Sequence, residues 1–168
     1  MIPDLFWIPG PWRGKLAVAT RPRGGDWLND EARGWRQAGL DVVVSLLEKE
    51  EATQLDLEHE GDFAESNNIH FLSFPIPDRG VPASMPDALL LLSHLGKALD
   101  EGKNVAVHCR QGVGRSGLIA AGLLATSGIG IAEAIGVVSV ARGLTVPETP
   151  SQLQWIYHLP SEHLAVAS

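Results

Sequence analysis

The chain has 168 residues, of which 45% are hydrophobic and 20% are charged, and its formal net charge is −7. This length and composition predict a single globular domain, residues 1–168, with a sizeable buried core. The negative charge argues against nucleic acid or an anionic membrane surface as a partner. One cysteine excludes an internal disulfide bond, and the first residues, MIPDLFWIPGPW, lack the pattern of a signal peptide, so we expect a cytoplasmic protein.

Short apolar runs predict buried strands at residues 16–20, 42–47, 70–76 and 104–108. These runs lack strict alternation, as expected of strands that are covered on both faces. Helical patterns cover residues 27–38, 52–67 and 85–101, the last with Ser84 as its cap and Gly102 at its end. Further helices are expected to begin near Arg115, Ile131 and Ser151. Strands that alternate with helices predict an α/β fold, with a mainly parallel central sheet flanked by helices.

Residues 117–138 are almost uniformly apolar, and Glu133 is their only charged side chain. A membrane span needs about 20 predominantly apolar residues, so this segment is long enough to be considered. However, Thr126-Ser127-Gly128 and Gly130 divide it into two shorter pieces. The pattern therefore favours two buried helices joined by a turn.

Residues 112–117, Gly-Val-Gly-Arg-Ser-Gly, fit the GxGxxG pattern of a dinucleotide-binding loop. That fold also requires an acidic residue about 20 positions further on, at the end of the next strand. Glu133 has this spacing but lies in a helical pattern, and only 51 residues follow Gly117. The dinucleotide interpretation is therefore rejected.

The same stretch carries a second pattern, in which His108 and Cys109 are followed by five residues and then by Arg115 and Ser116. Cys109 lies at the carboxyl end of a predicted strand, where ligands bind in such sheets. A glycine-containing loop that leads into a helix N-terminus turns its N–H groups inward and favours a phosphate or a thiolate. Arg115 adds a planar charged fork, so we expect a lowered thiol pKa at Cys109. Ser116 is placed to donate its hydroxyl proton to the sulfur.

This pattern resembles the signature of the cysteine-based protein tyrosine phosphatases, compact dual-specificity type. The segment Pro-Ile-Pro-Asp at residues 75–78 is similar to the cyclin-dependent kinase-associated subgroup. The resemblance implies that Cys109 is the nucleophile and that Arg115 and Ser116 assist it. It also implies a loop that binds phosphate, formed by His108, Arg110, Gln111, Gly112, Val113 and Gly114. No metal or organic cofactor is implied.

The resemblance also implies a general acid about 30 residues before the cysteine. Asp78 precedes Cys109 by 31 residues and directly follows a predicted strand. Pro-Asp-Arg-Gly is an ordinary turn sequence as well, but its position favours the catalytic role. Thiolate and protonated carboxyl together predict a bell-shaped pH profile with a mildly acidic optimum. The neighbouring Arg79 fits either a substrate contact or a solvated turn charge.

Residues 148–152, Glu-Thr-Pro-Ser-Gln, resemble the family's Gln-Thr-x-x-x-Gln segment, which positions the hydrolytic water. Glu148 replaces the first glutamine, and Gln152 matches the second, so either residue is a candidate for positioning water. Thr149 and Pro150 fit equally well as the cap and first turn of the last helix.

The implied function is a phosphomonoester hydrolase that works through a phosphocysteine, with a phosphorylated protein or peptide as substrate. Gln111 and Val113 stand where lipid-phosphate members often have lysine, which favours phosphoprotein over phosphoinositide substrates. A rhodanese-type sulfurtransferase, which would not need Asp78, and a non-catalytic phosphate-binding module are the alternatives. A thiol-cascade arsenate reductase would need further cysteines. The sequence leaves the oligomeric state and the physiological target open.

Overall fold

The computed structural model describes residues 4–160, and a five-stranded sheet forms the centre of the described part. The strands are β1 (Leu5–Ile8), β2 (Leu16–Ala19), β3 (Val42–Ser45), β4 (His70–Ser73) and β5 (Val105–His108), in the order β1-β2-β5-β3-β4. Only β1 is antiparallel to its neighbour. The predicted α/β fold with a mainly parallel central sheet is confirmed.

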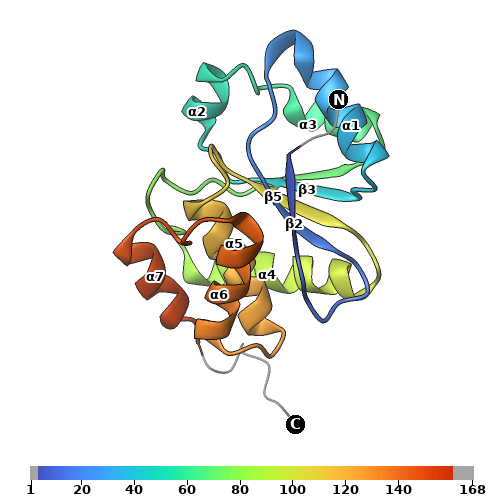
Figure 1. Cartoon of the computed structure of the whole chain (residues 1–168). Coiled ribbons are helices and arrows are strands. Elements are labelled where there is room, and N and C mark those ends of the chain that lie inside the picture. The colour runs from blue at the N-terminus through green and yellow to red at the C-terminus, as the bar shows by residue number, and fades with distance from the viewer. Residues whose placement is uncertain (1–3, 161–168) are drawn as a thin grey trace.

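Helices cover both faces of this sheet (Figure 1). They are η1 (Gly25–Trp27), α1 (Leu28–Gln37), α2 (Lys49–Gln54), α3 (Glu60–Ser66), α4 (Met85–Asp100), α5 (Gly114–Thr126), α6 (Ile131–Arg142) and α7 (Pro150–Tyr157). One core cluster joins Ala17, Val43 and Ala106 of the sheet to Trp35 of α1 and Ala64 of α3. Alternate strand residues point the other way, into a larger core with α4, α5 and α7. Burial on both faces explains the apolar strands without alternation.

The strand register places the carboxyl ends of β2, β5 and β3 at one edge of the sheet. His108 ends the central strand and is level with Ala19 on one side and Ser45 on the other. The chain leaves β5 at this edge, turns through residues 109–113 and enters α5. The fold therefore delivers Cys109 to the sheet edge at which ligands bind in parallel α/β proteins.

Two predicted elements differ from the structure because of local backbone geometry. The helix expected at residues 52–67 is two short helices, α2 and α3, with Asp56 between them in a left-handed conformation (φ 57°). The buried strand expected at residues 70–76 is the edge strand β4, which has no buried residue and ends at Ser73, before Pro75. Its continuation still follows β3, because Phe74 N–H donates to the Ser45 carbonyl and Ile76 N–H donates to the Leu46 carbonyl. The edge strand β1 was not predicted, since its four residues are too short to show a period.

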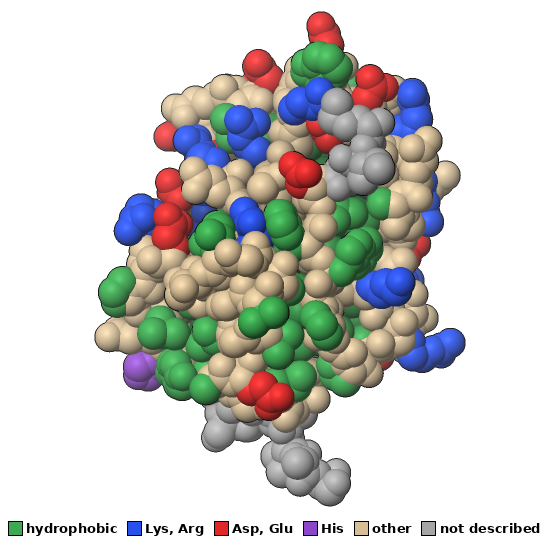
Figure 2. Space-filling model, viewed as in Figure 1, with side chains coloured by type: hydrophobic (Ala, Val, Ile, Leu, Met, Phe, Trp, Pro, Cys, Tyr) green, Lys and Arg blue, Asp and Glu red, His purple; other side chains and the backbone are tan. Residues whose placement is uncertain are grey.

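The apolar segment 117–138 forms two helices, as predicted, but only α5 is buried along its length. In α6 only Ala134 and Val138 are buried, and Val140 is 84% exposed. Val137, Val140 and Trp7 line an open pocket of about 560 Å³, and Figure 2 shows hydrophobic side chains gathered on this part of the surface. Within residues 4–160, no helix is both long enough and apolar enough to span a membrane.

Candidate active site

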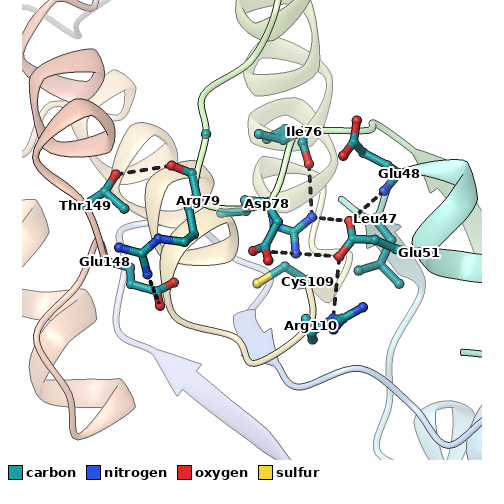
Figure 3. Close-up of polar contacts among 12 residues, drawn as sticks. Leu47, Glu48, Glu51, Ile76, Asp78, Arg79, Cys109, Arg110, Glu148 and Thr149 are labelled. Atoms are coloured by element: carbon teal, nitrogen blue, oxygen red, sulfur yellow. Dashed lines mark hydrogen bonds and ion pairs between the residues drawn. The ribbon is translucent and has the colours of Figure 1, made fainter. Parts of the chain in front are cut away.

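Three of the predicted catalytic residues, Asp78, Cys109 and Arg115, meet in a pocket of about 210 Å³ beyond the carboxyl end of β5, and Ser116 is buried beneath it. Its lining is formed by Asp78, Arg79, Cys109, Arg110, Gln111, Val113, Gly114, Arg115 and Glu148. Figure 3 shows the Cys109 sulfur below the Asp78 carboxylate, with Arg79 and Glu148 on one side and Glu51 and Arg110 on the other. Segments that are far apart in the sequence thus bring a thiol, three guanidinium groups and two carboxylates to one opening.

The backbone of the loop depends on Gly112, whose φ is +72°. A β-carbon at this position would lie 2.8 Å from the Ala19 carbonyl oxygen at the end of β2. Only glycine combines this dihedral angle with so close an approach of two backbones. This packing fixes the loop against the neighbouring strand β2. The helix α5 follows the loop and begins at Gly114.

The thiol of Cys109 is 3% exposed, yet its pKa is lowered from that of an ordinary cysteine. Burial acts in the opposite direction and raises the pKa. This effect is outweighed by hydrogen bonds from the Ser116 hydroxyl and from the N–H groups of Ser116 and Gly112, and by the charge of Arg115. The Ser116 hydroxyl is fully buried, and no nitrogen or oxygen among residues 4–160 is hydrogen-bonded to it. The site therefore favours a thiolate, the nucleophilic form of cysteine.

Arg115 is 2% exposed and lies at the start of α5, with its guanidinium held from three directions. Nη1 donates to the Ile76 carbonyl at 3.0 Å, and Nη2 lies 3.2 Å from Asp78 Oδ1. The carboxylate of Glu51 accepts from both terminal nitrogens, at 2.6 and 3.1 Å. These contacts orient the guanidinium, and they raise the Arg115 pKa although its burial lowers it.

Glu51 was not identified from the sequence. It is the third residue of α2, where it also closes a capping box with Glu48. Its pKa is lowered, because Arg115 and the Glu48 N–H outweigh the effect of burial, which raises it. Glu51 also lies 3.6 Å from Arg110 in the phosphate loop. The capping-box spacing was visible in the sequence, but the contact with Arg115 joins residues 64 positions apart and needs the fold.

Asp78 lies in a tight turn that is tied to the segment before α7. Gly80 N–H donates to the Pro77 carbonyl, and Arg79 between them has a φ of +62°. Arg79 Nη1 is 3.1 Å from Glu148 Oε1. The buried Gln152 donates from Nε2 to the Gly80 carbonyl at 3.0 Å. These contacts hold the turn so that the Asp78 carboxylate faces the guanidinium of Arg115.

Glu148 and Gln152, the two candidates for positioning water, have different surroundings. The Gln152 Oε1 accepts from the N–H groups of Glu148 and Thr149, at 3.1 and 3.2 Å. Thr149 is the N-cap of α7 and forms a capping box with Gln152, as one of the two interpretations of this segment predicted. Backbone groups thus occupy both ends of the Gln152 amide, whereas the Glu148 carboxylate lines the pocket.

Behind the nucleophile, His108 forms a buried pair with Glu60 of α3. The His108 Nε2 and Glu60 Oε2 lie 2.5 Å apart, and the side chains are 2% and 3% exposed. The pKa of His108 is raised, because Glu60 outweighs the opposing effect of burial. The ring stacks on Trp35 at 6.2 Å, and its Nδ1 lies 3.2 Å from the Cys109 carbonyl oxygen. His108 therefore does not line the pocket but supports the strand end that carries Cys109.

No group of three or more His, Cys, Asp or Glu side chains in the described part of the chain could hold a metal ion. The positive groups that face the pocket are instead arginine side chains and loop N–H groups. Such an arrangement binds a tetrahedral dianion by charge and by hydrogen bonds at once.

Comparison with known proteins identifies the class to which this fold and site belong. Residues 17–129 match the family model described as "Tc-R-P: Polymorphic toxin system, DSP-PTPase phosphatase". The chain therefore belongs to the DSP-PTPase phosphatase family. The predicted resemblance to dual-specificity phosphatases is confirmed, and the sulfurtransferase and binding-module alternatives are not favoured.

Individual known proteins are similar to this chain in sequence, in fold or in both. Tk-PTP in its active form is 31% identical, with a TM-score of 0.76, and the match covers 95% of this chain and 97% of that one. A kinase associated phosphatase with its catalytic cysteine changed to serine has a TM-score of 0.87 at 18% identity, over 97% of both chains. Protein 197R of Invertebrate iridescent virus 6, named as a candidate tyrosine phosphatase, is 26% identical over 160 residues. This alignment covers 92% of the present chain but only 56% of the viral protein.

Proposed function

We propose that this protein is a phosphomonoester hydrolase, a protein tyrosine or dual-specificity phosphatase that works through a phosphocysteine intermediate. The observation that carries the proposal is the pocket in which Cys109, Arg115 and Asp78 meet. The thiol has a lowered pKa, and the guanidinium beside it lies 3.2 Å from the carboxylate. A sulfurtransferase or a passive phosphate receptor would have no use for the carboxylate.

In the first step, the Cys109 thiolate attacks phosphorus and the bond from phosphorus to the ester oxygen breaks. Asp78 gives its proton to the departing oxygen, so that the product leaves as a neutral alcohol or phenol. Arg115 binds two phosphate oxygens through Nε–H and the Nη2–H that faces Asp78, because Nη1 is occupied by Glu51 and the Ile76 carbonyl and the other Nη2–H by Glu51. The loop N–H groups bind the remaining charge.

In the second step, water attacks phosphorus and the bond to sulfur breaks. Asp78, now a carboxylate, takes a proton from the water, and inorganic phosphate leaves. The Ser116 hydroxyl stabilises the departing thiolate. We assign the positioning of this water to Glu148, because its carboxylate lines the pocket while backbone groups hold the Gln152 amide at both ends.

The expected substrate is a phosphorylated protein or peptide. Gln111 and Val113 of the loop line the pocket and carry no charge, and the loop's Arg110 lies 3.6 Å from Glu51, which favours a phosphoprotein over a phosphoinositide headgroup. The nucleophile must remain reduced, because a low-pKa thiolate is readily oxidised. This requirement supports a cytoplasmic location.

The test is phosphate release from p-nitrophenyl phosphate and a phosphotyrosine peptide, from about pH 4 to about pH 9. We expect a bell-shaped profile for the wild type, no turnover for Cys109→Ser, and a large loss for Asp78→Asn that is greatest on the peptide. Asp62→Asn, an exposed carboxylate change on α3, is the matched control. If the wild type binds the phosphotyrosine peptide but does not hydrolyse it, the loop is a phosphate receptor and the enzyme proposal is wrong.

The role of Glu148 is tested separately by pre-steady-state kinetics. If Glu148 positions the water, Glu148→Ala slows hydrolysis of the phosphocysteine more than its formation, and an initial burst of p-nitrophenol appears. Gln152→Met removes the amide and loosens the Asp78 turn, so it should slow the first step. A burst in Gln152→Met and none in Glu148→Ala would reverse the assignment.

A further inference from the structure

A residue outside the signature contacts the outer side of the phosphate loop. Arg142, in the last turn of α6, donates from Nη2 to the Gln111 carbonyl and from Nε to the Gly112 carbonyl. Both distances are 2.9 Å. The two carbonyls belong to successive peptide groups, and one guanidinium holds both.

The contact controls where the N–H groups of the loop point. In a trans peptide unit, the C=O and the N–H point in opposite directions. The Gln111 carbonyl shares its unit with the Gly112 N–H, and the Gly112 carbonyl shares its unit with the Val113 N–H. When Arg142 holds the two carbonyls on the outer side, both N–H groups must point inward. The Gly112 N–H does so, since it is among the groups that lower the pKa of the Cys109 thiol.

Arg142 is itself fixed in place for this contact. Its Cζ lies 4.1 Å from the ring centroid of Phe6 in β1, a cation–π distance. A cation also suits the C-terminal end of α6, where the helix dipole is negative. None of the ion pairs among residues 4–160 involves Arg142. Its partners are therefore the ring and the two loop carbonyls.

The loop requires such support because of its glycine. Gly112 adopts a positive φ, and glycine populates negative φ values about as readily, so the residue alone does not hold this conformation. Rotation of either peptide unit would turn a carbonyl oxygen toward the pocket, where it would repel a thiolate or a phosphate. We infer that Arg142 is a positioning residue of the phosphatase site, which holds the phosphate loop with its N–H groups directed at the sulfur and the substrate. This inference rests on the proposed function, but it is tested without turnover.

The experiment compares Arg142→Met and Arg142→Lys with the wild type. Arg33→Met is the matched control, because it removes an exposed arginine that pairs only with Asp30 on α1. The rate of Cys109 alkylation by iodoacetamide is measured against pH, and inorganic phosphate is titrated until it halves that rate. For Arg142→Met we expect a higher thiol pKa and a roughly 10- to 100-fold weaker protection by phosphate. Lysine reaches one carbonyl but not both, so Arg142→Lys should fall between.

Three outcomes overturn the inference. Wild-type thiol pKa and phosphate protection in Arg142→Met would show that the loop needs no support. Full recovery in Arg142→Lys would assign the effect to charge alone. If Arg142→Met does not fold, Phe6→Leu takes its place, because it removes only the ring that contacts the guanidinium. A wild-type thiol pKa and wild-type phosphate protection in Phe6→Leu would then contradict the inference. If the wild type hydrolyses no phosphoester, the proposed function fails, but the alkylation data still decide the role of Arg142.

Discussion

The carboxylate of Glu51 and the guanidinium of Arg115 form a two-pronged ion pair, with Nη1–Oε1 at 2.6 Å and Nη2–Oε2 at 3.1 Å. The pair joins α2 to the start of α5 across the pocket, and its side chains are 12% and 2% exposed. A bidentate pair with so little solvent fixes the plane of the guanidinium as well as its position. The orientation of Arg115, the arginine that we propose binds phosphate, is thus set by a residue outside the pocket lining.

Replacement of Glu51 by glutamine should weaken phosphate binding without loss of the fold. Glutamine can accept from one nitrogen of Arg115 but not from both, and it carries no charge. We expect kcat/KM for p-nitrophenyl phosphate to fall by about 10- to 100-fold, mainly through KM. Steady-state kinetics with inorganic phosphate as a competitive inhibitor measures the effect.

The matched control is Glu50→Gln, because Glu50 is an exposed neighbour on the same helix turn. The lowered pKa of Glu51 means that its stabilising effect is present above the ordinary glutamate pKa and is lost as the pH falls through the folded-state value. The ion pair therefore persists at the mildly acidic pH expected for catalysis. Equal kinetic losses in Glu50→Gln and Glu51→Gln would contradict the role of this ion pair.

The sequence predicted the sheet because each buried strand has its own apolar run. Such runs are local in the sequence. The pattern of residues 108–116 is local as well, because each of its residues is recognised by its spacing from Cys109 along the chain. The break between α2 and α3 was missed, because a single residue, Asp56, turns the chain where the helical pattern is weak. Strand β1 was not predicted because an edge strand of only four residues carries almost no periodic signal.

In the site, the sequence could not reveal the residues that act through others. Glu51, Glu60 and Arg142 are separated from their partners in the loop by 64, 48 and about 30 positions. Glutamates and arginines with no motif around them are common on helix surfaces, so only the fold distinguishes these three. The same holds for Gln152, whose structural contacts become visible only when its neighbours in space are known.

The lowered pKa of Cys109 predicts rapid alkylation at neutral pH. A thiolate persists below the ordinary cysteine pKa, about 8.5, and the rate should decline only as the pH falls through the lowered value. Ser116→Ala removes a hydrogen bond to the sulfur, so the midpoint of the alkylation profile should move to higher pH. An unchanged midpoint would show that the hydroxyl does not stabilise the thiolate. Inorganic phosphate should protect both proteins, which controls for reaction outside the pocket.

The buried pair of His108 and Glu60 predicts a stability that depends on pH. The folded-state pKa of His108 is raised, so its stabilising effect is complete below the unfolded value of about 6.5 and is lost as the pH rises through the folded value. Glu60→Gln leaves a buried imidazolium without its counter-charge and should cost roughly 3 kcal/mol near pH 6. The deficit should shrink at alkaline pH. Urea unfolding at several pH values measures it.

A surface pair on the same helix provides the control for this measurement. Asp62 lies 3.3 Å from His59, and these side chains are 83% and 75% exposed. Asp62→Asn should therefore change the free energy of unfolding by no more than about 0.5 kcal/mol at any pH. A pH-independent deficit in Glu60→Gln would show that packing of the carboxylate, and not the charge of His108, makes this pair stabilising.

Of two glycine-to-alanine changes, Gly112→Ala should lower the activity, whereas Gly136→Ala should raise the stability of the fold. Gly112→Ala places a methyl group 2.8 Å from the Ala19 carbonyl oxygen at a φ of +72°, so the phosphate loop must move away from β2. If the loop N–H groups bind the transition state, as we propose, kcat/KM should fall by about 100-fold or more. Gly136→Ala, in the exposed middle of α6, meets no atom within 4 Å and should stabilise the protein by about 0.5–1 kcal/mol. Kinetics and thermal unfolding of both variants separate the loop from the helix, and wild-type activity in Gly112→Ala would refute the tight packing of the loop against β2.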